Sequence, residues 1–183
     1  MKTIISSIIF ILTILCMFFI TENIAYLQFA SLQANELPLS YNIISGISSS
    51  LAALTPLVVF VFLYVTIETM MNIVFEEHIK ALDLYSILGF SFLPMLLYEY
   101  FFWYNLKIYG KQTIEYSTEG INNMKFLFGL EQRDMSYINT CCWIALYMII
   151  IFYFFFKGKS MWKTLVSVLL PTALTIAFYR LIS

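Results

Sequence analysis

LYSILGFSFLPMLLYEYFFWY, residues 84–104, is the stretch that decides the fold. It is long enough to cross a bilayer, because an α-helix needs about 20 apolar residues to span the hydrocarbon core. Gly89 and Pro94 lie near its middle, and Glu99 lies where lipid does not tolerate an unpaired charge. We therefore predict a transmembrane helix with a Gly/Pro kink, against which the other spans pack.

The rest of the chain is equally apolar. Of its 183 residues, 61% are hydrophobic and 11% are charged, and the mean hydropathy is +0.85. Ordinary soluble domains contain about 45–50% apolar and about 25% charged residues, so a soluble core would not hide this much apolar surface. The composition predicts an all-α fold, a polytopic membrane helical bundle, with residues 1–183 forming one integral membrane domain.

Five apolar segments are expected to be the transmembrane helices. They are residues 4–21, 51–75, 84–104, 138–156 and 162–182. We interpret the first as an uncleaved span and not as a signal peptide, because the flank from Thr21 to Ala25 has no small-residue cleavage pattern. Pro56 falls in the first turns of the second span, where a missing N–H costs little.

The two longer segments between spans are predicted to be loops. Residues 23–50 suit either a short amphipathic segment in the interface, from Tyr26 to Leu37, or an ordered loop that caps the bundle. Residues 105–137 carry balanced charges and read as a solvated loop, with a helix near residues 120–131.

The short loops carry the signal for membrane orientation. With the N-terminus inside the cell, the cytoplasmic side receives five lysines, and the first loop, which has no Lys or Arg, falls outside. These lysines are Lys2, Lys80, Lys157, Lys159 and Lys163. We predict a multi-pass protein of the cell membrane with a cytoplasmic N-terminus and an outer C-terminus.

Polar residues within the spans are the candidate sites. Glu68 and Asn72 are four residues apart and share one helix face, which should point into the bundle. Glu99 and Arg180 are expected at similar depth near the outer surface, and we favour a salt bridge between them over a proton or substrate site. A cavity opened by the Gly/Pro interruption opposite Pro171 in the fifth span is a further expectation.

Several kinds of chemistry find no support in the pattern. The net charge of −1 offers no basic field for nucleic acid. His78 is the single histidine and no CxxC occurs, so we expect no metal and no cofactor. Glu76-Glu77-His78 is not HExxH and is interpreted as a solvated turn. Cys141 and Cys142 are interpreted as packing residues.

The run from Ser86 to Leu97, SILGFSFLPMLL, resembles a known signature. Yip-domain membrane proteins carry a similar S-x-L-G-[FY]-x-x-L-P run in their third span. The number of spans, the long first and third loops and the Lys-bearing turn before the last span also resemble that family. The resemblance implies an α-helical, non-enzymatic membrane protein of bacterial type, and some bacterial members accompany export systems.

We therefore expect a bacterial inner-membrane protein that acts by binding. Its expected partners are the lipid bilayer and another membrane protein, either a transporter subunit or a second copy of the chain. In this interpretation it is an accessory or immunity-type subunit associated with a transporter or export system. The alternative is a permease-type transport subunit with a mid-membrane site at Pro94, Pro171 and the acids. An intramembrane enzyme ranks third.

Overall fold

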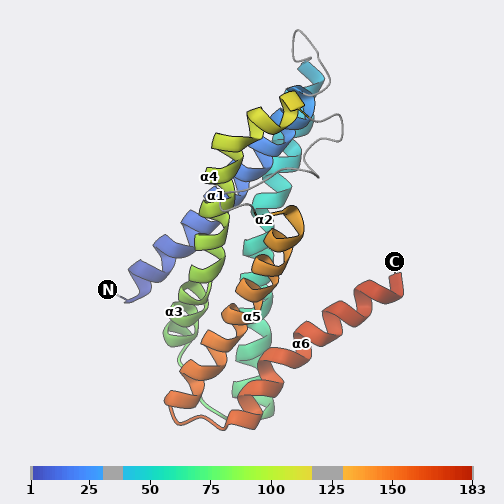
Figure 1. Cartoon of the computed structure of the whole chain (residues 1–183). Helices are drawn as coiled ribbons and strands as arrows, with labels where there is room; N and C mark the ends of the chain where they lie inside the picture. Colours follow the sequence, from blue (N-terminus) through green and yellow to red (C-terminus); the bar gives the residue numbers. More distant parts are fainter. Residues whose placement is uncertain (1, 31–38, 117–129, 183) are drawn as a thin grey trace. The chain divides into compact units, whose positions relative to one another are not determined.

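The computed structural model describes residues 2–30, 39–116 and 130–182, and every regular element in these ranges is a helix. The predicted all-α class is thus confirmed for the described part of the chain. In order (Figure 1), the elements are α1 (Lys2–Ala30), α2 (Leu39–Thr69), the π-helix η1 (Met70–Val74), α3 (Ala81–Ser91), α4 (Leu93–Tyr116), α5 (Gln132–Phe156) and α6 (Met161–Ile182).

Four helical segments are long and apolar enough to cross a membrane. They are Lys2–Ala25, Ser45–Val74, Ala81–Ile108 and Arg133–Phe156. Each corresponds to one of the first four predicted spans, and only the second ends short of its predicted span, at Val74. Large apolar side chains are exposed along them, as at Ile4 and Val58, both 64% exposed, and such side chains suit contact with lipid. These features fit a multi-pass membrane protein. The fifth predicted span lies within α6, and its crossing of the membrane stays a prediction.

The helices extend beyond the predicted spans. α1 continues to Ala30 and α2 begins at Leu39, so most of the predicted 23–50 loop is helical. Because α2 begins at Leu39, Pro56 lies well inside this helix, where it is buried. Our prediction that it falls in the first turns of the helix was wrong. α4 likewise continues to Tyr116. The predicted helix near residues 120–131 lies almost entirely outside the described residues.

The third span is divided at Phe92. α3 ends at Ser91 and α4 begins at Leu93, which makes Pro94 the second residue of a helix, where it removes no helical hydrogen bond. The N–H of Phe92 donates to the carbonyl of Phe90. The chain thus satisfies this carbonyl locally. The Gly/Pro kink of the axis stays a prediction.

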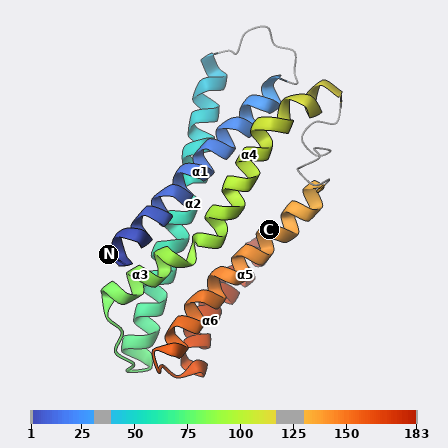
Figure 2. The same cartoon turned by 60° about the vertical axis from the view of Figure 1, so that its left-hand side comes forward.

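The chain forms two compact units, which we describe separately. Unit 1 comprises residues 1–10, 57–94 and 143–183, and unit 2 comprises residues 11–56 and 95–142. In unit 1 the first turns of α1 lie beside α3 (Figure 2), and the Ser7 and Tyr85 hydroxyls are hydrogen-bonded at 3.0 Å. The Phe10 ring packs against Phe60 and Phe92, at centroid distances of 4.5 and 5.3 Å.

Gly89 is the residue that permits this close approach. A Cβ atom at Gly89 would lie 2.8 Å from the carbonyl oxygen of Ser6 and 2.9 Å from its Cβ. Ser6 Oγ in turn donates a hydrogen bond to the carbonyl of Ser86. The described contacts of Gly89 therefore make it a packing residue between α1 and α3, a role that we had not assigned to it.

Unit 2 has its own apolar cluster around Ile20, Leu106 and Met135. Four partly buried aromatic residues of α4 pack against this cluster, and they include Tyr98 and Trp103. Tyr100 and Tyr104 are exposed instead, at 56% and 43%. The aromatic residues at 98–104 are therefore divided between the core of unit 2 and its exposed surface.

Candidate functional site

Two short chain reversals in unit 1 form the polar end of that unit. Residues 75–80 connect η1 to α3, and residues 157–160 connect α5 to α6. Gly158 has φ of 74°, which only glycine adopts without strain, and Glu76 has φ of 55°. Short reversals of this kind bring side chains from distant parts of the sequence together.

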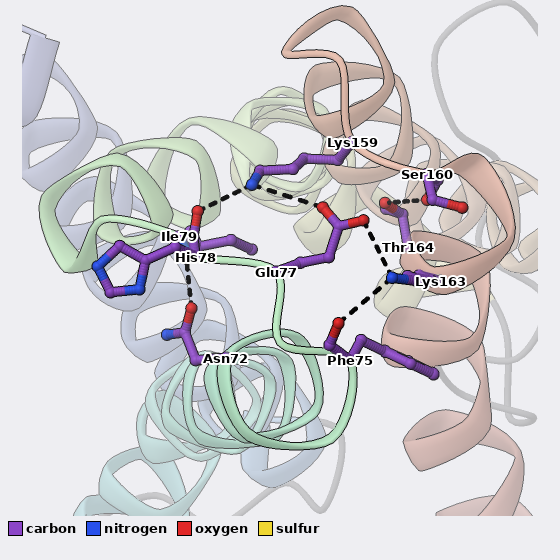
Figure 3. A network of polar contacts seen from close by, with 9 residues as sticks. All are labelled: Asn72, Phe75, Glu77, His78, Ile79, Lys159, Ser160, Lys163 and Thr164. Carbon is purple, nitrogen blue, oxygen red and sulfur yellow. Dashed lines mark hydrogen bonds and ion pairs between the residues drawn. The ribbon is translucent and has the colours of Figure 1, made fainter.

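Glu77 joins the two reversals through an ion-pair cluster, which we call the lysine clamp and define as Glu77, Lys159 and Lys163 (Figure 3). One carboxylate oxygen lies 3.5 Å from Lys159 Nζ and the other 3.4 Å from Lys163 Nζ. Each lysine also donates to a backbone carbonyl of the 75–80 segment. Lys159 donates to His78 at 2.8 Å, and Lys163 donates to Phe75 at 3.3 Å.

The 75–80 segment is also held from the helix before it. Asn72, within η1, accepts a hydrogen bond from the N–H of Ile79 through Oδ1 at 2.7 Å (Figure 3). The N–H of Glu77 donates to the carbonyl of Met71 at 2.7 Å. These bonds fix the backbone on which the Glu77 carboxylate is presented to the two lysines.

The electrostatics of Glu77 follow from this arrangement. Partial burial acts to raise the pKa of its carboxyl, but the hydrogen bonds and charges of Lys163 and Lys159 together outweigh burial and lower the pKa below its ordinary value. Glu77 is therefore ionised at neutral pH, as the clamp requires.

A cleft of about 840 Å³ opens in unit 1 beside these reversals. Its walls come from the first turns of α1, from α3 and from the end of α5. The lining includes Lys2 and Ile5 from α1, Asp83 and Phe90 from α3, Phe152 from α5, and Lys157 directly after α5. The cleft is lined mainly by apolar side chains, and its charged residues are two lysines and one aspartate.

Three polar groups of the cleft lining already have partners: the Ser6 hydroxyl and the backbone carbonyls of Ser86 and Thr3. Ser6 Oγ donates to the carbonyl of Ser86, and the carbonyl of Thr3 accepts from Ser7 Oγ at 2.9 Å. The ammonium of Lys157 lies 5.7 Å from the ring centre of Tyr153, a cation–π distance. Apolar side chains thus predominate in the lining of the cleft, and its charged residues lie at the ends of the helices.

Unit 2 contains the other prominent acid, Glu99, on α4. Its side chain is 1% exposed, and neither carboxyl oxygen has a hydrogen-bond partner among the described residues. A buried carboxyl without a partner is costly, so Glu99 is either neutral or paired with a group outside that set.

The other predicted residues have varied positions. Glu68 is half-buried, and Asn72 is half-buried and holds Ile79, a local role. Pro94 is half-buried and Pro171 is buried within α6. The side chain of Arg180 lies outside the described residues, so the predicted Glu99–Arg180 bridge stays a prediction.

Sequence reasoning missed the lysine clamp. We interpreted Glu76-Glu77-His78 as a solvated turn, and this holds for Glu76 and His78, which are exposed, but not for Glu77. The available signal was that an acidic turn and a lysine-rich turn were both predicted on the cytoplasmic side. Among the described residues, no three His, Cys, Asp or Glu side chains are grouped so as to hold a metal ion.

Comparisons with protein-family models, with curated proteins and with solved structures gave no match to this chain. The resemblance to Yip-domain proteins therefore rests on the Ser86–Leu97 run and the arrangement of the spans alone.

Proposed function

We propose that this chain is a Yip-like, five-span protein of the bacterial inner membrane that acts by binding, as an accessory or immunity-type subunit of a transporter or export system, and not as an enzyme. The observation that carries the proposal is the construction of unit 1. The lysine clamp ties two loops together directly beside an open cleft with an apolar floor. A braced surface of this kind suits recognition of another molecule.

The position of the lysines supports the proposed topology. Lys159 and Lys163 bind the same carboxylate, and Lys2 and Lys157 line the same cleft. Four of the five lysines assigned to the cytoplasm thus gather around two features of unit 1. Such a grouping is what the positive-inside rule favours for one membrane surface.

Co-purification in a mild detergent tests the proposed role. We expect the tagged chain to retain an ATPase-bearing transporter in a fixed stoichiometry through size-exclusion chromatography. Glu77→Gln should weaken this complex because it loosens the loops, whereas Glu76→Gln, the exposed neighbour, should leave it intact. Solute flux by the purified chain alone in liposomes would contradict the accessory role.

A transport subunit is the second candidate, and Glu99 is the observation that favours it. Ionisable groups buried within membrane spans frequently mark proton or ion paths. In this case Glu99→Gln would abolish proton-coupled flux in liposomes while leaving expression and thermal stability unchanged. Retention of full flux by that variant would remove Glu99 from the transport mechanism.

A further inference from the structure

The cleft of unit 1 has charged residues at the ends of its helices and an apolar surface between them, and this arrangement suits a ligand with one charged and one apolar part. Ile5, Phe90 and Phe152 are lining residues that are also exposed, at 45%, 43% and 45%. They come from three different helices, so the apolar surface is concave and not a single helix face. A concave apolar surface of this volume is typical of sites for small ligands.

Three polar groups of the cleft lining are already engaged within the protein. The Ser6 hydroxyl and the Ser86 carbonyl are bonded to each other, and the Thr3 carbonyl accepts from Ser7. A sugar, a nucleotide or a peptide backbone would leave many of its polar groups unpaired against the apolar side chains of Ile5, Phe90 and Phe152, which is unfavourable. A hydrocarbon chain has no such groups, so it fits.

The charges at the ends of the helices specify the other part of the ligand. Lys2 starts α1 and Lys157 directly follows α5, and both are exposed lining residues of the cleft. Asp83 is the one acidic residue in the lining, so the net charge of the cleft lining is positive. A phosphate group on an apolar tail complements this distribution, because each basic side chain near a membrane surface attracts anionic lipid.

We propose that this cleft binds an anionic phospholipid, with its phosphate between Lys2 and Lys157 and an acyl chain on the floor formed by α1, α3 and α5. The site does not depend on the proposed accessory role, since it belongs to unit 1 of the isolated chain. Lys159 and Lys163 are engaged by Glu77 and take no part in it.

Native mass spectrometry of the full chain in a neutral detergent tests the headgroup. Phosphatidylglycerol and phosphatidylcholine with identical acyl chains are the probes. We expect one phosphatidylglycerol to be retained at a concentration at least tenfold lower than phosphatidylcholine. The double variant Lys2→Gln/Lys157→Gln should abolish this preference, and Asp83→Asn should increase it, because the opposing charge is removed.

Lys80→Gln is the matched control for charge. Lys80 is exposed in the same unit but does not line the cleft, so its loss should leave the preference unchanged. Equal retention of the two lipids by the unaltered chain would overturn the proposal. An equal effect of Lys80→Gln and of the double variant would also overturn it, because attraction would then be general to the surface.

A larger side chain in the cleft tests whether its apolar surface binds the acyl chain. Ile5→Trp should lower the affinity for both lipids about tenfold, whereas Ile4→Trp, at the adjacent exposed position outside the cleft, should not. Glycerol phosphate alone, at millimolar concentration, should fail to displace the lipid. Complete displacement would identify a phosphate site and overturn the assignment to lipid. If Ile5→Trp does not fold, the lysine variants and this competition decide the question.

Discussion

Glu77 in unit 1 and Glu99 in unit 2 are both acids in a largely apolar protein, yet their surroundings are opposite. Glu77 is on a loop, keeps 19% of its side chain exposed and has two lysine partners. Glu99 is within α4, is 1% exposed and has no hydrogen-bond partner among the described residues. Unit 1 therefore uses its acid to join segments, whereas unit 2 buries one without a hydrogen bond among the described residues.

The packing of the two units differs in the same sense. In unit 1, close polar and aromatic contacts join the helices. They include the Ser7–Tyr85 hydrogen bond and the Phe10–Phe60 ring pair. Unit 2 is held by an apolar cluster with aromatic side chains around it. The comparison implies that small changes are felt more strongly in unit 1, and the following substitutions test this.

The largest effect is expected at Gly89. Gly89→Ala should lower the free energy of unfolding by about 1–3 kcal/mol, the usual range for overpacking, because the added methyl group meets the Ser6 backbone at 2.8 Å. Gly46 in unit 2 is the matched control, with nothing within 4 Å. Gly46→Ala should raise stability by up to about 1 kcal/mol, since alanine favours helix. Unfolding by SDS in detergent micelles measures both, and equal effects would contradict the comparison.

Glu99→Met should raise the free energy of unfolding by about 1–2 kcal/mol, because it removes a buried carboxyl without a hydrogen bond among the described residues. The same SDS titration measures it. A loss of stability would show instead that Glu99 has a partner. In that case Arg180→Met should cost a similar amount, and the double variant should cost no more than either single one.

Glu77→Gln should lower stability by about 1 kcal/mol or less, as expected for partly exposed ion pairs. Glu76→Gln is the control, because Glu76 is exposed and adjacent. Thermal unfolding of the two variants in the same detergent gives the comparison. Indistinguishable melting temperatures would show that the clamp contributes nothing to stability.

The smallest effect is the pH dependence of the clamp. The pKa of Glu77 is lowered in the folded chain, so its contribution is present above the unfolded value of about 4.5 and is lost as the pH falls through the folded value. The difference in melting temperature between the unaltered chain and Glu77→Gln should be constant near pH 7 and vanish in strong acid. A difference that grows toward acid would have the wrong sign for this mechanism.

The sequence was sufficient for the helical class because each span carries its own signal. Hydropathy over about 20 residues depends on no tertiary contact, which is why the first four predicted spans match the long apolar helices. The helix ends were less predictable, since α1 continues to Ala30 past its apolar run, and α2 begins at Leu39, before its predicted span, and includes Gly46. Helices that protrude from a membrane give no hydropathy signal.

The site was predicted less well for a different physical reason. The lysine clamp and the cleft depend on which loops and helix ends meet in space, as with Glu77 and Lys163, which are far apart in the chain. Gly89 was recognised as important from its place in the third span, but its contact with Ser6 depends on how α1 packs. Single-span patterns contain no information about such pairings.

The π-helix η1 determines the direction in which Asn72 and the residues after it point. Its wider turn, in which the Phe75 N–H donates to the carbonyl of Met70 at 2.9 Å, accommodates one residue more than an α-turn does. Deleting a single residue between Met70 and Val74 would keep the segment apolar and helical, yet it would displace Asn72 or Glu77 from its partners. The length of this segment, more than its composition, therefore determines whether a related chain can form the lysine clamp.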